Sequence, residues 1–355
     1  MKALDPSGLL QLRTSGADNR STWTFRQSSK RPSAGAAFTV RNVPGKGMGM
    51  FAARDIEPGE RIIAEKPLAR WAVRTSATRE ERIRSFAEVV VDFSAEQKAK
   101  LLGLSEASHY GKIPGKRTLM GTWLTNALPI NYEDGQGSSA DMEEAAVFET
   151  ICRINHSCLP SCHHEWNPSI GADGMETVHA LRAIAQDEEL SISYLMPAGR
   201  LRAERQQLLS SRFGFECRCP LCSLDGEARA RSDSCQRAIG DVSTPDFHGL
   251  ALPDLLKRLN LRLSFLAREG LPEVWARPLL VAAMVQSMQD RTPSGREKSK
   301  ELAARASACV RLSAGEDHPN YATVSTFIQV VERFESQHGG SAGLAAALAA
   351  GGGRG

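Results

Sequence analysis

Three cysteines lie within six residues in the second half of the chain. They are Cys217, Cys219 and Cys222, with Pro220 bending the backbone between them. Closely spaced thiolates can wrap one zinc ion, which takes four tetrahedral sulfur or imidazole ligands. Charged residues interleave these thiols, which is untypical of a buried apolar run. Because the loop is too short for a core of its own, a closed structural zinc site would supply folding energy there.

The spacing shows three zinc ligands and leaves the fourth open. Candidates on spacing alone are Cys158, Cys162, Cys235 and the histidines. The chain has eight cysteines in 355 residues, and its first 37 residues lack an apolar signal-peptide core. This usage points to a reducing compartment, in which thiols or a metal are expected rather than disulfides.

Composition excludes several classes of protein. Apolar residues make up 41% and charged residues 24%, which argues against a wholly disordered chain, a collagen-like repeat or a coiled coil. The best apolar run, 278–288, is shorter than the roughly 18 residues of a membrane span, so no membrane role is expected. The 44 Lys and Arg against 41 Asp and Glu give a net charge of +3, too little to make nucleic acid the default partner.

Hydropathy patterns predict an α+β chain. Alternation of apolar and polar residues, bounded by Gly and Pro turns, indicates strands at 38–43, 61–65, 163–166, 177–181 and 190–194. Helical spacing of apolar residues occurs over 76–107, and the run that opens at Asp141 is expected to form a helix towards Cys152. Helices are also predicted over 200–211, from Leu250 onward, and from Pro319, where a proline in the first turn is harmless.

The two ends have biased compositions. Residues 1–36 are basic and rich in Ser and Thr, which suits a disordered arm, with an organellar transit peptide as the alternative. Residues 339–355 are mostly Gly and Ala, which is typical of a flexible tail.

Four motifs in order carry a family resemblance. They are the glycine cluster 45–49, Arg-Ile-Asn-His-Ser-Cys-Leu-Pro at 153–160, Glu-Glu-Leu-Ser-Ile-Ser-Tyr at 188–194, and Phe-Glu-Cys-Arg-Cys-Pro-Leu-Cys at 215–222. Together they resemble a SET-domain protein-lysine methyltransferase with a post-SET zinc motif, most similar to SMYD-like and fungal SET proteins. The stretch 71–150 has no cysteine, so the MYND finger of SMYD proteins is not expected in it.

The resemblance implies a mostly β SET core with a helical insertion, a Cys-rich post-SET zinc site and an α-helical, TPR-like C-terminal region. We therefore expect a disordered arm at 1–36, a SET core at 37–70 and 146–196, a helical insertion at 71–145, a post-SET motif at 197–225, a helical region at 226–338 and a flexible tail at 339–355.

The resemblance also implies a binding site for S-adenosylmethionine and the fourth zinc ligand. The residues that match the cofactor motifs of the family are Lys46, Gly47, Met48, Asn155, His156 and Phe215. In the family the cysteine of the Asn-His-Ser-Cys motif completes the structural Zn²⁺ site, which here assigns Cys158 beside Cys217, Cys219 and Cys222.

Tyr194 matches the tyrosine that stands beside the methyl-transfer channel of the family, so it is the expected catalytic residue. The attacking lysine must be neutral, although its ordinary pKa is about 10.4. An apolar channel next to a cationic sulfonium favours the neutral amine. A second family tyrosine is replaced by Phe213, which widens the channel and either permits higher methylation states or weakens catalysis. Ser161 replaces an asparagine of the motif, which bears on local turn geometry.

Two functions from different classes follow from these residues. The first is S-adenosylmethionine-dependent methylation of the ε-amine of a lysine in a protein or peptide, with histones among the candidate substrates. The alternative is a catalytically silent SET scaffold that binds zinc, with or without S-adenosylmethionine, and recruits partner proteins. Tyr194 and Asn155 favour activity, whereas Phe213 favours the scaffold. The expected location is the nucleus, the cytoplasm or both. The acidic pair at 188–189 is interpreted as a solvated turn rather than as a site.

Overall fold

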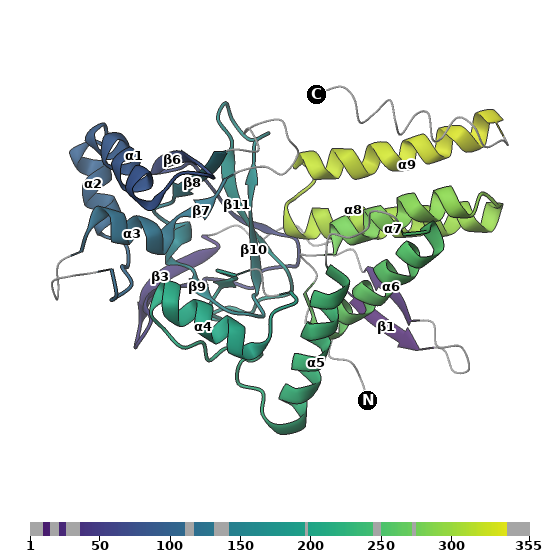
Figure 1. The fold of residues 1–355 in the computed structure, drawn as a ribbon, viewed down its shortest axis with the longest axis horizontal. Helices are drawn as coiled ribbons and strands as arrows, with labels where there is room; N and C mark the ends of the chain where they lie inside the picture. Colours follow the sequence, from purple (N-terminus) through teal and green to yellow (C-terminus); the bar gives the residue numbers. More distant parts are fainter. Residues whose placement is uncertain are drawn as a thin grey trace.

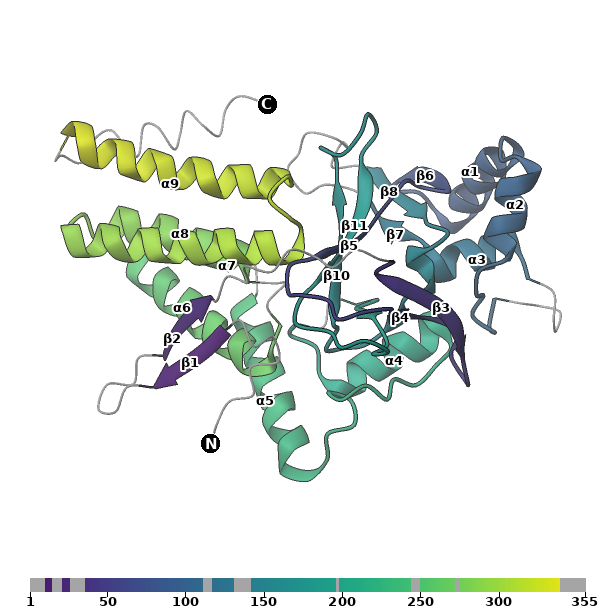
Figure 2. The ribbon, with the colours of Figure 1, turned by 180° about the vertical axis from the view of Figure 1, so that it is seen from behind.

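A strand-rich core lies between two helical regions in the computed structural model (Figure 1). The structure describes residues 10–14, 21–25, 36–110, 117–130, 142–195, 198–243, 250–271 and 275–338. Seen from behind, the central strands again separate the helices of the N-terminal half from those of the C-terminal half (Figure 2). No described helix is both long and apolar enough to cross a membrane.

The core is built from short strands that pair over long sequence distances. Its main sheet has the order β10-β11-β5, formed by Cys162–Asn167, Met175–Ala180 and Arg61–Glu65 in antiparallel pairs. A hairpin of β3 (Phe38–Val43) and β4 (Gly47–Ala52) carries the glycine cluster in its turn. Met50, Ile56, Ile154 and Val178 belong to the buried cluster that these strands enclose. The five predicted strand regions are confirmed, although the last shortens to β12 (Ser191–Ile192).

The insertion combines helices with a second small sheet. Its helices are α1 (Arg79–Val91), α2 (Ala95–Leu102) and α3 (Leu119–Asn126), and its strands are β6 (Ala69–Arg74), β7 (Leu128–Pro129) and β8 (Met142–Val147). Thr78 and Ser94 begin the first two helices with capping boxes, which satisfy backbone N–H groups that a helix start leaves unpaired. Trp71 packs against Phe86 and Trp123 in the core of this lobe.

The helix predicted from Asp141 towards Cys152 is wrong. Met142–Val147 is strand β8, which pairs along its length with β6 and also with β7, and only a 3₁₀ turn, η1 (Ile151–Arg153), follows. The Glu-Glu-Ala-Ala sequence has high helix propensity, but pairing with strands distant in the sequence overrides such a weak local preference. The insertion is therefore mixed rather than purely helical.

The described residues of the C-terminal part form mainly helices. These helices are α4 (Arg202–Phe213), α5 (Gly226–Ser243), α6 (Leu252–Glu269), α7 (Ala276–Gln289), α8 (Pro293–Ser313) and α9 (Pro319–His338). From α5 onward each helix packs on the next in the chain, which is the arrangement that tandem helical hairpins require. The helix start predicted at Pro319 is confirmed.

The loop between α8 and α9 docks the helical region on the main sheet. Arg61 of β5 bonds both His179 of β11 and Asp317 of this loop. The buried His318 faces the Trp166 carbonyl of the edge strand β10 through its Nε2 atom, at 3.2 Å. The two regions therefore share a polar contact at one end of the sheet.

Strands also occur near the N-terminus, within the segment expected to be disordered. β1 (Leu10–Thr14) and β2 (Ser21–Phe25) form an antiparallel pair, and their Thr, Trp and Phe residues are typical of strands. The remainder of 1–35 and the tail at 339–355 lie outside the described residues.

Candidate active site and zinc centre

Two motifs far apart in the sequence meet through a parallel strand pair. β9 (Asn155–His156) pairs with β12, so that Asn155 lies opposite Ser191 and His156 opposite Ile192. Tyr194 follows two residues after the end of β12, and Cys158 follows two residues after the end of β9. This pairing brings the expected cofactor, catalytic and metal residues into one region of the core.

Four cysteine sulfur atoms form a compact cluster beside this pair. The Sγ atoms of Cys158, Cys217, Cys219 and Cys222 all lie within 4.8 Å of one another, and those of Cys158 and Cys222 are 3.6 Å apart. Tetrahedral zinc with bonds of about 2.3 Å to sulfur places thiolates roughly 3.8 Å apart. Among the described residues this is the one group of His, Cys, Asp and Glu side chains that could hold a metal ion. The donor set and its spacing fit a closed zinc site, with Cys158 as the fourth ligand.

Four thiolates this close together would repel one another unless a cation lay between them. Contacts with the other three cysteines raise the pKa of Cys158 far above its ordinary value, because neighbouring sulfur atoms oppose further negative charge. Contact with Cys158 lowers the pKa of Cys222 to about 7. A bound divalent cation would favour the ionised form of each thiol, since metal binding releases the thiol protons.

One face of α4 holds the cysteine loop in place. Gln206 accepts a hydrogen bond from the Cys217 N–H at 2.9 Å and donates one to the Cys217 carbonyl at 2.7 Å. Arg202 donates to the Cys222 carbonyl at 2.7 Å. Arg205 is 1% exposed, and the nearby Cys158 and Cys222 sulfur atoms outweigh its desolvation and raise its pKa. Arg205 and Gln206 come three and four residues after Arg202, so both lie on the same side of the helix as Arg202.

His156 links the cysteine cluster to Tyr194. Its Nδ1 atom accepts a hydrogen bond from the Tyr194 N–H at 2.9 Å, which places the ring proton on Nε2. That Nε2 atom faces the Cys158 sulfur at 3.2 Å and can donate to it. Burial lowers the pKa of His156 to about 4, so the ring is neutral. Both ring nitrogen atoms of His156, a predicted cofactor residue, therefore have partners within the protein.

Tyr194 is a protonated phenol, and its ring packs among other aromatic rings. Its hydroxyl donates to the Ile154 carbonyl at 2.7 Å, and burial raises its pKa above the ordinary value. Its ring centroid lies 5.1 Å from that of Phe213 and 6.5 Å from that of Phe215. Phe213 and Phe215 add no hydroxyl, so the surface around the Tyr194 ring is largely apolar.

The opening turn of β3–β4 lies against Asn155. The Asn155 side-chain Nδ2 donates to the Met48 carbonyl at 3.3 Å and to the Glu189 Oε1 atom at 2.8 Å. Lys46 reaches the same carboxylate, with its Nζ atom 2.7 Å from Oε2. Gly47 has φ of 80°, a conformation that glycine adopts without strain. The predicted cofactor residues 46–48 and Asn155 are therefore brought together.

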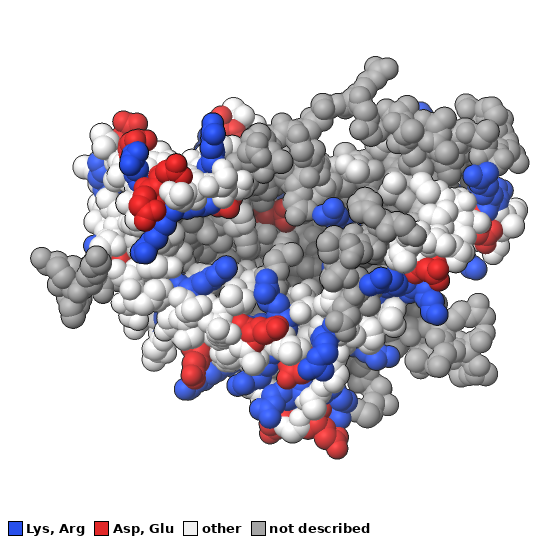
Figure 3. Space-filling model, viewed as in Figure 1, with Lys and Arg blue, Asp and Glu red and all other residues white. Residues whose placement is uncertain are grey.

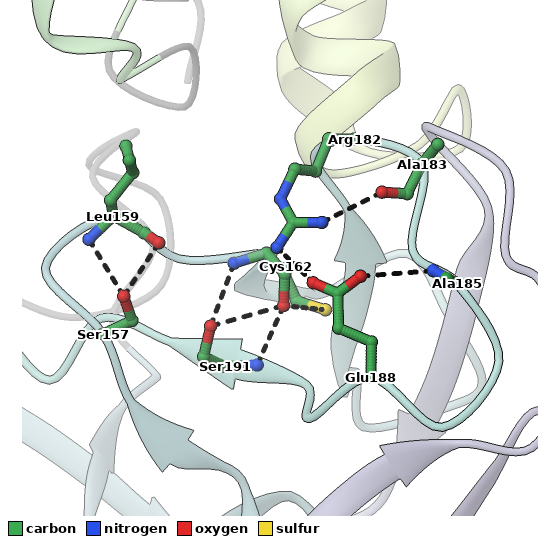
Figure 4. Close-up of polar contacts among 9 residues, drawn as sticks. Ser157, Leu159, Cys162, Arg182, Ala183, Ala185, Glu188 and Ser191 are labelled. Carbon is green, nitrogen blue, oxygen red and sulfur yellow. Dashed lines mark hydrogen bonds and ion pairs between the residues drawn. The ribbon is translucent and has the colours of Figure 1, made fainter. Parts of the chain in front are cut away.

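A serine and arginine network supports the segment between the two motifs (Figure 4). Ser161, which replaces the asparagine of the family motif, donates from its backbone to Ser191 and accepts the Ser191 N–H at 2.9 Å. Glu188 accepts hydrogen bonds from Arg182 at 2.5 Å and from the Ala185 N–H at 3.2 Å. The substitution at 161 thus retains a tie between the two motifs.

The acidic pair at 188–189 is only partly exposed, and both carboxylates have partners in the protein. Arg205 and Gln206 were also not singled out from the sequence. Their position on a predicted helix just before the cysteine cluster was the sequence signal that could have identified them. No sequence signal indicates which side chains Glu189 contacts.

The strand-rich core and its site are similar to a SET domain over part of the chain. Residues 47–195 match the family model of the SET domain. The curated relatives include "Histone-lysine N-methyltransferase set5" of Schizosaccharomyces pombe, which is 32% identical over 188 residues, 53% of this chain and 51% of that protein. "Histone-lysine N-methyltransferase ASHR1" of Arabidopsis thaliana is 23% identical, with 53% of this chain and 55% of that protein covered.

A shorter match is found with "Protein-lysine N-methyltransferase SMYD4" of Mus musculus, 38% identical over 81 residues, 22% of this chain and 9% of that protein. The chain thus spans about half the length of the relatives that it matches over the longest stretches. The matched region extends from Gly47, directly after the turn between β3 and β4, to Leu195, and it contains the strand pair of β9 and β12.

Proposed function

We propose that the chain transfers methyl groups from S-adenosylmethionine to the ε-amine of a protein lysine. The observation that carries the proposal is the position of Tyr194: a protonated phenol held by the Ile154 carbonyl, next to Phe213 and linked through His156 to the cysteine cluster. A silent scaffold would need the zinc centre but would not need this link. The names of the relatives also support an enzyme.

The residues around Asn155 fit the cofactor. Both N–H groups of its amide are engaged by Met48 and Glu189, and its amide oxygen has no hydrogen-bond partner among the described residues. That oxygen can accept a hydrogen bond from an amino group of the ligand. Gly47 and Met48 are exposed beside this amide, and Phe215 supplies an aromatic surface. When bound, S-adenosylmethionine supplies an electrophilic methyl group on a sulfonium.

The protein would act mainly by alignment and by desolvation of the amine. The raised pKa of the Tyr194 hydroxyl excludes a phenolate base at neutral pH. The Tyr194 hydroxyl and the nearby carbonyl therefore orient the amine instead. Apolar walls from Phe213 and Phe215 disfavour an ammonium group and lower the pKa of an entering lysine. Correct orientation of reacting atoms can contribute several kcal/mol to lowering a barrier.

We propose histones as the first substrates to examine, because the longest-matching relatives are named histone-lysine methyltransferases. Basic and acidic side chains are interspersed over the described part of one face (Figure 3), so this face gives no reason to prefer a nucleic acid. We further propose that the enzyme acts in the nucleus, the cytoplasm or both.

Calorimetric titration of the zinc-loaded full chain with S-adenosylmethionine tests the cofactor assignment. We expect binding by the wild type and a loss of at least about tenfold in affinity for Asn155→Ala, since a buried polar ligand group would lose its partner. Asn42→Ala, which removes an exposed amide from the same hairpin, is the control and should bind normally. No binding by the wild type would contradict the proposed function and favour the scaffold.

A further inference from the structure

Glu189 makes two contacts at the expected cofactor site. It lies one residue beyond Glu188 in the turn before β12, and its backbone bridges to Phe51 of β4. Its carboxylate accepts one hydrogen bond from Lys46 and one from Asn155, each on a different oxygen atom. The side chain is 24% exposed, so it is largely enclosed by these partners.

The carboxylate determines which way the Asn155 amide points. An amide side chain can present either its oxygen or its NH₂ group to a neighbour, whereas an ionised carboxylate can only accept hydrogen bonds. With Glu189 on one side and the Met48 carbonyl on another, the NH₂ group satisfies two acceptors. The reversed amide would place its oxygen against two other oxygens, which is repulsive. The Asn155 oxygen is therefore the atom left for a ligand.

Glycine at position 49 makes this close approach possible. A Cβ atom at Gly49 would lie 2.9 Å from Asn155 Nδ2 and 3.1 Å from Glu189 Oε1, as well as 2.6 Å from a methyl group of Val43. Any side chain there would push the hairpin away from the amide or from the carboxylate. The hairpin, Asn155 and Glu189 thus form one tightly packed unit.

We propose that Glu189 is a positioning residue for the cofactor site, which it acts on by fixing the Asn155 amide and tethering Lys46. This inference rests on the proposed function, because it assigns Glu189 to the same S-adenosylmethionine site. Glu189 sets the affinity for cofactor, whereas the transfer step depends on Tyr194.

The chain offers a matched control two residues earlier. Asp187 also pairs with a cation of the same hairpin, Arg41 of β3, at 2.9 Å. This pair is more exposed, with 46% of the Arg41 and 70% of the Asp187 side chain accessible, and it does not contact Asn155. If Glu189 only anchored the hairpin, loss of either carboxylate would have comparable consequences.

The test compares Glu189→Gln with Asp187→Asn in the full chain. Glutamine keeps the size of the side chain but removes its charge, and it can present an NH₂ group to Asn155. We expect Glu189→Gln to raise the Kd for S-adenosylhomocysteine, and the KM for S-adenosylmethionine, by about tenfold, the scale of one weakened charge-assisted hydrogen bond. The kcat at saturating cofactor and the zinc content should stay within about twofold of the wild type, as should all of these quantities for Asp187→Asn.

Wild-type binding together with an unchanged Kd for Glu189→Gln would overturn this inference alone. Equal losses for both variants would reduce Glu189 to a structural anchor and would also overturn it. Absence of binding by the wild type would instead reject the proposed function, and the assignment of Glu189 with it.

Discussion

At the scale of residues, the site depends on hydrogen bonds that fix protonation and orientation. The His156 ring is neutral with its proton on Nε2, because the Tyr194 N–H occupies Nδ1. The Tyr194 hydroxyl is a donor to a carbonyl and remains protonated. Both groups therefore enter the proposed reaction as orienting groups rather than as bases, and the substrate lysine must lose its proton to solvent.

Tyr194→Phe should abolish most of the methyl transfer while leaving the cofactor bound. The change removes one hydrogen bond to Ile154, which we expect to lower the free energy of unfolding by about 1 kcal/mol. Misalignment of the amine should lower kcat by about 100-fold. Steady-state kinetics and calorimetry on the same sample check this. Wild-type kcat in the variant would exclude a catalytic role for the hydroxyl.

At the scale of elements, the loop between α8 and α9 packs tightly against the main sheet and joins the helical region to it. Gly315 has φ of 92°, and a Cβ atom there would lie 2.8 Å from Arg61 Nη2 and 3.1 Å from His179 Nε2. The contact depends both on the left-handed backbone and on the absence of a side chain.

Gly315→Ala should therefore destabilise the protein by roughly 2 kcal/mol, because strain in the backbone adds to displacement of Arg61 and His179. Chemical denaturation measures this. Gly45→Ala is the matched control, since Gly45 has φ of 76° but nothing within 4 Å of its added Cβ atom. Equal losses for the two variants would show that backbone strain alone is responsible and that the contact is unimportant.

His179 should make stability depend on pH at this contact. Burial, assisted by Arg61, lowers its pKa from 6.5 to about 3, and Asp317, His163 and His318 are the other charged or titratable groups that act on it. Because the unfolded chain binds the proton more tightly, stability should fall as pH decreases from about 6.5 towards 3. Denaturation across this range should show a shallower slope for His179→Gln. An unchanged slope would assign the pH dependence to other groups.

The sequence predicts elements well where the pattern is local and poorly where pairing is distant. Local sequence signals mark three of the helices: capping residues at the starts of α1 and α2, and Pro319 at the start of α9. The sequence of strand β8 predicts a helix, because its pairing with β6, some 70 residues earlier, leaves no local signal in the sequence. The order of the motifs predicts Cys158 as a zinc ligand and Tyr194 as the catalytic residue. The contacts of Glu189 and Arg205 arise only when the chain folds.

At the scale of the whole molecule, one cysteine cluster joins the core to the loop after α4. Cys158 comes from the core and the other three cysteines from that loop, and His156 extends the link to Tyr194. Loss of zinc should therefore disturb the active site as well as the loop.

Cys158→Ser should lower zinc content and stability together. We expect a loss of roughly 3 kcal/mol or more, on the order of 10 °C in Tm, because the metal contributes directly to folding. Cys235→Ser is the control: Cys235 is also buried, but it donates to the Phe265 carbonyl and lies outside the cluster. Unchanged zinc by atomic emission in Cys158→Ser would reject it as a ligand.

The central claim is that the chain methylates protein lysines with S-adenosylmethionine and that Tyr194 is required. Its most direct test is incubation of the zinc-loaded full chain with methyl-labelled S-adenosylmethionine and mixed histones, followed by mass spectrometry of the labelled residues, with Tyr194→Phe in parallel. The account predicts label on lysine with the wild type and a loss of about 100-fold with the variant. Label transferred equally by both proteins, or no label on any lysine from a wild type that binds the cofactor, would contradict it.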